Sequence, residues 1–218
     1  MQRERLTRAQ RREQTRECLL GAAREQFVKK GLAATSVEDI AEAAGYTRGA
    51  FYSNFGDKQE LLIELLRRDE DMARASLQAT LAEGGTPDEM KERAIVYYSQ
   101  CVLEQDCFSL WIEAKLLACR DPQFQERISA FRQEKLDLAR EHILAFSERN
   151  GRKLALRVDE LALGLLSLCD GLQFSRMCNP QMVTDKVMHT VFAGFFSCVL
   201  WRRPEEASYE DHRARVVE

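Results

Sequence analysis

The sequence predicts an all-α protein in which a small N-terminal domain precedes a larger helical body. Two observations support this fold class. Apolar residues recur at helical spacing from the first helix onward, and the 218 residues include only 4 prolines and 11 glycines, too few for the turns of a β architecture. A hydrophobic content of 45% with 31% charged residues is typical of a globular chain that buries a core.

The first helix is expected over about residues 15–30. Gly31 follows two lysines, and a glycine after basic residues is a typical C-terminal end of a helix. One apolar face is formed, at the spacing i, i+3, i+4 and i+8, by Leu19, Ala22, Ala23 and Phe27.

A pair of short helices joined by a tight turn is expected next. Ser36, with Asp39 three residues later, resembles a capping box and begins a second helix that ends at Gly45. Thr47 is a suitable N-cap for a third helix, which Gly56 ends. Two short helices around a glycine-containing turn form the helix-turn-helix pattern. A small helical bundle with a solvated polar face has the same spacing and remains an alternative.

A fourth helix is expected from residue 57 to about residue 81, where the breaker Gly-Gly-Thr-Pro follows at 84–87. The body that follows is rich in apolar helical periodicity. Its helices are expected at about residues 88–105, 107–120, 122–149, 159–177 and 183–201.

Charge is distributed unevenly along the chain. The net charge is −3, yet residues 1–30 hold nine basic and four acidic side chains, which gives +5 there and −8 in the remainder. Because affinity for nucleic acid depends on Lys and Arg neutralising phosphates, a basic end beside an acidic body suggests contact with DNA through that end. A basic, solvated N-terminal tail would give the same distribution.

Cysteine usage and apolar run length indicate the compartment. Seven cysteines are an odd number without a Cys-x-x-Cys pair, and the N-terminus is polar and arginine-rich, which predicts buried thiols in the reducing cytoplasm. Two apolar stretches, at 161–169 and 187–201, are shorter than the roughly 20 residues that span a bilayer. No membrane partner is therefore expected.

One stretch carries a family resemblance. Residues 35–61 are TSVEDIAEAAGYTRGAFYSNFGDKQEL, and this run closely resembles the DNA-binding signature of the tetracycline-repressor (TetR) family over about residues 12–66. The resemblance implies a homodimer that binds a double-stranded DNA operator and answers to a small-molecule effector. It implies a helix-turn-helix domain at residues 1–66, with a fourth helix linking from residue 57, and a ligand-binding and dimerisation domain at residues 67–218.

The resemblance also implies which side chains meet DNA, and helix physics favours several of them. N–H groups at a helix N-terminus bind phosphate, which suits Ser36 and Thr47, and the Arg48 guanidinium can bond two acceptors on a guanine edge. A solvated Arg48 or a structural Tyr52 remains an alternative. The predicted DNA-binding residues are Ser36, Val37, Thr47, Arg48, Gly49, Tyr52, Asn54 and Lys58.

The last two long helices are apolar nearly all round. From residue 161 to 175 only Asp170 is charged, and residues 187–201 hold no charge at all. Such helices must be covered on both sides, which predicts a subunit interface, although burial within one chain is the alternative. The interface is expected to include Leu161, Gly164, Leu165, Leu168, Val191, Phe195 and Val199.

A mostly apolar ligand site is expected in the body, lined by aromatic and soft side chains, each of which is individually more typical of a core. The side chains considered are Tyr97, Tyr98, Cys101, Phe108, Trp111, Phe131, His142, Phe146 and Phe174. We favour Tyr97, Cys101, Phe108, Trp111 and Phe174, together with Asp170, a carboxylate expected to be buried in an apolar helix.

The predicted function is therefore a repressor that a small, largely apolar molecule releases from a palindromic operator. Catalysis has little support, because the three histidines are far apart in sequence and no Gly-x-Ser-x-Gly or phosphate-binding loop occurs; no metal or cofactor is expected. A thiol-sensing regulator is the first alternative and needs a thiolate of lowered pKa at Cys101, Cys107 or Cys119. A helical interaction module without DNA binding is the second, and the polar face of the third helix argues against it.

Overall fold

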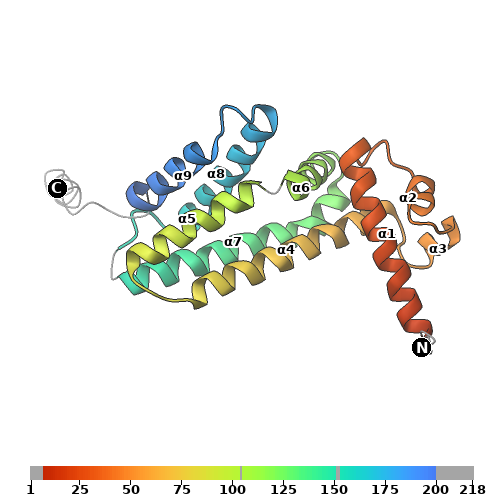
Figure 1. Cartoon of the computed structure of the whole chain (residues 1–218), viewed down its shortest axis with the longest axis horizontal. Helices are drawn as coiled ribbons and strands as arrows, with labels where there is room; N and C mark the ends of the chain where they lie inside the picture. Colours follow the sequence, from red (N-terminus) through yellow and green to blue (C-terminus); the bar gives the residue numbers. More distant parts are fainter. Residues whose placement is uncertain (1–6, 104, 151–152, 200–218) are drawn as a thin grey trace, which may run out of the picture. The chain divides into compact units, whose positions relative to one another are not determined.

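The computed structural model describes residues 7–103, 105–150 and 153–199 (Figure 1). Over these residues the elements are α-helices and one π-helical turn, which confirms the all-α fold class. No helix in this part of the chain is long and apolar enough to cross a membrane. The elements are α1 Arg8–Lys30, α2 Val37–Ala43, α3 Arg48–Tyr52, α4 Lys58–Ala82, α5 Pro87–Leu103, α6 Gln105–Ala118, α7 Pro122–Asn150, α8 Val158–Cys178, α9 Asp185–Gly194 and the π-turn Phe195–Val199.

The helix bounds agree with the expected ones to within two residues, except at the two ends of the chain and in α3. Helix α3 was expected to continue to Gly56, but it ends at Tyr52 because the chain turns at Ser53 and Asn54. Helix α1 begins seven residues early because Thr7 and Gln10 form a capping box, in which each side chain accepts the other residue's backbone N–H at 3.2 and 2.8 Å. The apolar spacing begins only at Leu19, so it missed the polar first turns. At the other end α9 stops at Gly194, and the π-turn follows where a continuous helix was expected.

The chain divides into two compact units. The first comprises residues 1–71 and 106–130, and the second comprises residues 72–105 and 131–218. Helices α4 and α7 each begin in one unit and end in the other, and α6 belongs almost entirely to the first. The functional boundary after residue 66 stays a prediction, since a division by contacts does not assign function.

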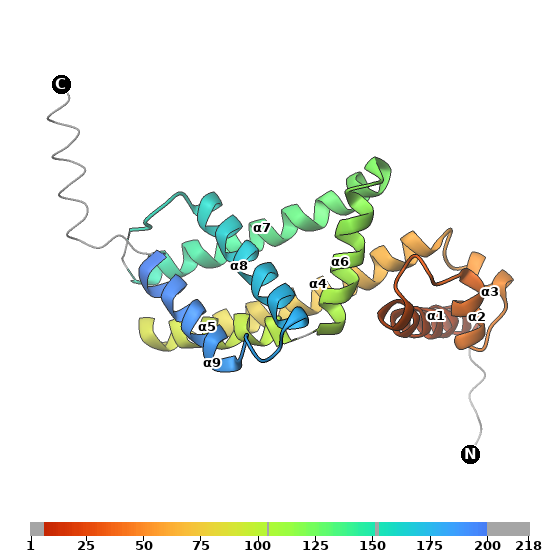
Figure 2. The same cartoon turned by 90° about the horizontal axis from the view of Figure 1, so that it is seen from above.

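In the first unit, α1 packs against α2 and α2 against α3 (Figure 2). The rings of Phe51 and Phe55 lie 5.8 Å apart in its core, where Phe55 also carries the Arg16 guanidinium 4.3 Å above its ring. The apolar faces predicted from helical spacing do point inward. The buried side chains of α1 to α3, of the residue Phe55 that follows and of the start of α4 include Leu19, Leu20, Ala22, Ala23, Phe27, Ile40, Ala41, Phe51, Phe55, Leu61, Leu62, Leu65 and Leu66.

Two arginines join α1 to the first half of α4. Arg24 on α1 donates two hydrogen bonds to the buried Asp69 carboxylate, at 2.5 and 3.2 Å. Arg68 on α4 donates two to Glu17, both at 2.6 Å, and this pairing lowers the pKa of Glu17. Because paired, planar arginine contacts fix orientation as well as distance, they hold the two helices in a single register.

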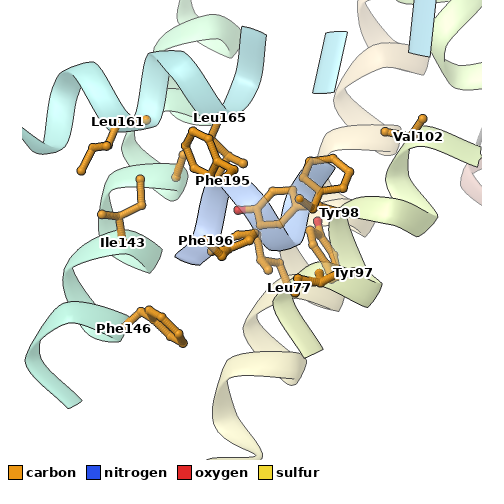
Figure 3. Packing of buried hydrophobic residues seen from close by; sticks show 14 of the residues in the cluster. Leu77, Tyr97, Tyr98, Val102, Ile143, Phe146, Leu161, Leu165, Phe195 and Phe196 are labelled. Carbon is orange, nitrogen blue, oxygen red and sulfur yellow. The ribbon is translucent and has the colours of Figure 1, made fainter. Parts of the chain in front are cut away.

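In the second unit, α5 packs against both α8 and α9. The core is rich in aromatic rings, with Tyr98 within 6 Å of both Phe192 and Phe196 between ring centroids. Figure 3 shows Tyr98 and Phe196 together in this cluster, with Ile143 and Phe146 on the neighbouring ribbon of α7. This core encloses the cavity described below.

Candidate nucleic-acid interface and ligand cavity

Side-chain caps set the start of α2 and of α3. The Ser36 hydroxyl accepts the Asp39 N–H at 3.0 Å, and the Thr47 hydroxyl accepts the Ala50 N–H at 3.2 Å. Hydrogen bonds from Ser36 and Lys30 hold the pKa of the Asp39 carboxyl well below its usual range. Both helices therefore begin at the residue expected from the sequence, and Val37 and Arg48 are their first helical residues.

The outer face of α3 is polar and ordered. The Arg48 side chain is 64% exposed, and its Nη1 lies 2.9 Å from Glu38 Oε1 on α2. Its Nη2 donates to the Tyr52 hydroxyl at 3.5 Å, with the guanidinium 5.4 Å from the centre of that ring. Tyr52 is itself 48% exposed. Arg48 and Tyr52 thus lie together on the solvent side of the helix, as predicted for DNA-contacting residues.

Gly49 lies between them without an internal reason to be glycine. Its backbone φ is not positive, unlike that of Gly45 at 75°. A Cβ added at Gly49 would meet no atom closer than the Thr47 hydroxyl oxygen, at 3.7 Å. Neither backbone strain nor packing within the chain therefore demands glycine here. Its effect is that no side chain covers the α3 backbone between Arg48 and Tyr52.

Two predicted DNA contacts have roles within the fold instead. The Asn54 amide donates to the Ala50 carbonyl at 2.8 Å, at the end of α3. The Lys58 ammonium donates to the carbonyls of Leu32 and Thr35, at 2.7 and 2.9 Å. Lys58 thereby anchors the loop between α1 and α2, a long-range contact that the sequence does not reveal. Contacts of these two side chains with DNA stay a prediction.

Two arginines of the basic N-terminal segment bind backbone carbonyls within the first unit. Arg12 donates to the Ser53 carbonyl at 3.4 Å, and Arg16 donates to the Asn54 carbonyl at 3.1 Å. These bonds connect α1 to the loop after α3. Charge counting alone missed this, because it does not separate arginines that bind their own backbone from arginines that remain at the surface, such as Arg8 and Arg11.

The second unit contains a small cavity of about 30 Å³. Tyr98, His142 and Phe146, which were considered for a ligand site, line it. The other lining residues come from α4, α5, α7, α8 and the π-turn. They are Leu77, Thr80, Met90, Ala94, Ile143, Leu165 and Phe196.

None of the six favoured ligand residues is on the wall of this cavity, and their contact with a ligand stays a prediction. The Tyr97 hydroxyl is bonded to the Ala73 carbonyl at 3.1 Å, and Cys101 is only half-buried. Asp170, expected to be buried, is exposed, and Phe174 is 54% exposed. The reason is that the chain covers α8 on one side only. Phe108 and Trp111 lie on α6, which belongs mainly to the first unit.

Three of the residues predicted for a subunit interface are buried inside this chain. Leu161, Leu165 and Phe195 are buried in the chain's own core, at 1%, 0% and 9% exposure. A helix that is apolar all round gives no sequence signal for the face that its own chain covers. A Cβ added at Gly164 would lie 3.8 Å from the Phe195 ring. Leu168 and Val191 are half-buried. The side chain of Val199 lies outside the described residues.

An apolar face of α8 remains open. Leu163, Phe174 and Met177 are exposed at 48%, 54% and 43%, and they share one side of the helix by their spacing. Gly171 lies among them, and nothing comes within 4 Å of the position its Cβ would occupy. We define these four residues as the open α8 face. On α9, Val187 is also exposed, at 39%.

The cysteines in the described part of the chain give no support to the thiol-sensing alternative. Cys101 belongs to the second unit and Cys119, which is exposed, to the first. Burial raises the pKa of the Cys169 thiol, which is the opposite of what a reactive thiolate needs. The side chain of Cys107 lies outside the described residues.

Comparison with known proteins identifies relatives of this arrangement. Residues 19–65 match the family described as bacterial regulatory proteins, tetR family. The transcriptional regulator TtgR of Pseudomonas putida is 46% identical over 68 residues, which are 29% of this chain and 32% of TtgR. The chain therefore matches only about a third of that relative's length. The transcriptional repressor AcnR of Corynebacterium efficiens is 30% identical over 162 residues, covering 72% of this chain and 79% of AcnR.

A solved structure shares the fold across both units' helices. A transcriptional regulator from Saccharomonospora viridis, crystallised in complex with choline, superposes with a TM-score of 0.74. The aligned residues cover 88% of this chain and 100% of that one, at 21% sequence identity. At that identity the likeness establishes the fold alone.

Proposed function

Because the chain belongs to the tetR family of bacterial regulatory proteins, we propose that it is a DNA-binding transcriptional repressor whose operator affinity falls when a small molecule binds. The observation that carries the proposal is the outer face of α3. Arg48 and Tyr52 are exposed there, mutually hydrogen-bonded and separated by a glycine with no structural need to be glycine. A helix presenting such a face suits the major groove.

The base-reading residue in this proposal is Arg48. Its guanidinium matches the paired acceptors of guanine, whereas Tyr52 and the N–H groups at the starts of α2 and α3 suit phosphate oxygens. Gly49 lets the α3 backbone approach the DNA closely. Val37 and Thr47 are at the starts of α2 and α3, so in this proposal they belong to the positioning contacts.

We propose that two copies associate through the open α8 face. Three exposed apolar side chains and a glycine on one side of a helix suit contact with a second copy of that helix. Two reading heads related by a two-fold axis require two inverted half-sites, so the operator is expected to be near-palindromic.

The effector site in this proposal is the cavity of the second unit. Leu77 and Thr80 of α4 are on its wall, and α4 is the helix that begins in the first unit. A ligand that displaces these side chains biases α4 and thereby the DNA-reading helices. Linkage of this kind typically changes affinity by about 1–3 kcal/mol, or roughly 5–150-fold.

Neither a thiol switch nor catalysis is proposed. The relatives compared are described as transcriptional regulators and repressors, and one structure of the same fold was crystallised with a small organic molecule, choline. The predicted sensor cysteines Cys101 and Cys119 belong to different compact units.

The test begins with selection of an operator by the purified protein from a random duplex library. We expect a near-palindromic consensus, and binding to it that weakens steeply with added salt, as phosphate contacts require. A thermal-shift screen then identifies compounds that stabilise the protein, and these are added to the protein–operator complex. Failure to enrich any sequence, with binding equal on all duplexes, would contradict the proposed DNA-reading role.

A further inference from the structure

His142 on α7 has a buried ring nitrogen without a partner. The residue is 7% exposed and lines the cavity. Its Nδ1 lies 3.4 Å from the hydroxyl of Tyr98 on α5, whereas its Nε2 has no hydrogen-bond partner in the described chain. A buried polar atom without a partner costs free energy in a folded protein, so such an atom at a cavity points to a molecule that completes it.

The Tyr98 contact favours one tautomer of His142. A buried hydroxyl hydrogen without an acceptor costs free energy, so Tyr98 is best satisfied when its O–H donates to His142 Nδ1, the ring nitrogen 3.4 Å away. Burial lowers the pKa of His142 to about 4, so the ring is neutral at pH 7 and carries one proton. With Nδ1 accepting from Tyr98, that proton is on Nε2, which is therefore a hydrogen-bond donor.

The remaining wall is neutral and almost entirely apolar. No Lys, Arg, Asp or Glu is among the lining residues. Thr80 carries the one other polar side chain of the set, and its hydroxyl already donates to the Ser76 carbonyl at 3.0 Å. An ionised ligand would find no opposite charge here, and burying a charge unpaired is strongly unfavourable.

We propose that this cavity binds a neutral, mostly apolar molecule bearing one hydrogen-bond acceptor, such as a ketone, ester or ether oxygen, and that His142 Nε2–H donates to that oxygen. The assignment rests on the proposed function, because it specifies the effector of the same cavity. His142 determines specificity, and Tyr98 positions it by fixing the tautomer.

The cavity is smaller than an organic effector. A volume of about 30 Å³ holds a water molecule, whereas a benzene-sized ligand needs about 150 Å³. An organic effector must therefore push lining side chains outward. Met90 is the most adaptable of them, since its unbranched thioether repacks readily. Leu77 and Thr80 of α4 are on the same wall, so filling the cavity displaces α4 as well.

The experiment compares benzene derivatives of nearly equal shape in direct binding to the full-length protein without DNA, by calorimetry at pH 7.5. Acetophenone carries the acceptor oxygen, and α-methylstyrene replaces that oxygen by a methylene group. Phenol adds a donor, and benzoate adds a charge. We expect acetophenone to bind about tenfold more tightly than α-methylstyrene, because one buried hydrogen bond is lost in the latter.

Variants assign the preference to Nε2. In His142→Phe the ratio between acetophenone and α-methylstyrene should fall to about one, whereas His142→Gln, which retains a donor, should keep part of it. His189→Phe is the matched control, because His189 is an exposed histidine on α9 and is not among the cavity residues, and it should keep the tenfold preference. On the wild-type protein, ¹⁵N NMR of the imidazole should show Nδ1 unprotonated and an Nε2–H signal that moves with acetophenone.

Several results would overturn the assignment. These are binding of no probe, equal binding of acetophenone and α-methylstyrene, or tightest binding of phenol or benzoate. A proton on Nδ1 in the NMR spectrum would do so even if the variants failed to fold. The proposed function is tested separately: a tenfold acetophenone preference without any effect of ligand on operator affinity would contradict the repressor mechanism and leave the chemistry of the cavity intact.

Discussion

Glu38 on α2 and Arg48 on α3 form an ion pair at the outer surface of the helix-turn-helix, with Nη1 and Oε1 2.9 Å apart. Both side chains are more than half exposed, at 57% and 64%. An exposed pair of this kind contributes little to stability, so DNA can displace Glu38 at little cost. The pair holds Arg48 in the free protein and competes with DNA for it.

Arg48→Ala should lose about 1–3 kcal/mol of binding free energy on the selected operator and much less on random duplex, because a base contact is made only on the true site. Glu38→Gln should bind both duplexes more tightly, since a carboxylate near phosphates is removed. Fluorescence anisotropy at fixed salt measures both, with the exposed Arg120→Ala as the control. Equal losses on both duplexes would exclude Arg48 from base reading.

Gly49→Ala should separate folding from DNA binding. Alanine in place of glycine stabilises a helix by about 0.5–1 kcal/mol, and nothing in the chain opposes a methyl group at this position. Gly21 on α1 is the matched control, because it is also an exposed helical glycine with no atom within 4 Å of its Cβ. Both variants should melt at or above the wild-type temperature, and only Gly49→Ala should lose operator affinity. Full affinity in Gly49→Ala would show that DNA does not approach α3 closely.

Phe174→Glu should give a folded monomer. The substitution places a charge on the open α8 face, which is exposed in one chain and covered in the proposed dimer. Leu144→Glu on α7 is the control, because Leu144 is similarly exposed, at 43%, and lies outside that face. Sedimentation velocity with circular dichroism distinguishes the outcomes. Leu165→Glu should instead unfold the second unit, and a Phe174→Glu protein that still sediments as a dimer would place the interface elsewhere.

Stability should fall as the pH is lowered from 7.5 to 5. Burial lowers the pKa of His142 from 6.5 to about 4, so between these values the unfolded chain binds a proton that the folded chain does not. The stability contribution is therefore complete above pH 6.5 and is lost toward pH 4, by about 2 kcal/mol at pH 5. Urea unfolding at both pH values measures it. His142→Gln should show a smaller pH dependence, whereas the exposed His189→Gln should retain it.

Local features of the fold were predictable from the sequence, because they depend on residues that are close together in the chain. The caps at Ser36 and Thr47 depend on residues three positions away, and glycine at 31 and 45 adopts positive φ where helices end. Lys58 was not predictable in the same way, because its ammonium binds carbonyls more than twenty residues earlier.

The residues around the cavity were harder to predict, because they are far apart in the sequence. Tyr98 and His142 are 44 residues apart and meet only when α5 and α7 pack. Both were among the side chains considered for a ligand site, yet each was more typical of a core. On α8, apolar residues occur on all sides, so helical periodicity could not distinguish buried Leu165 from exposed Phe174.

We expect ligand and operator to shift the same conformational equilibrium of the protein in opposite directions. The affinity of one ligand with and without saturating operator measures this. A compound from the thermal-shift screen is titrated into the free protein and into the protein–operator complex at the same salt concentration. We expect the ligand to bind the complex roughly 5–150-fold more weakly than the free protein. Because linkage is reciprocal, the ligand should weaken operator binding by the same factor. Identical ligand affinities in the two titrations would contradict it.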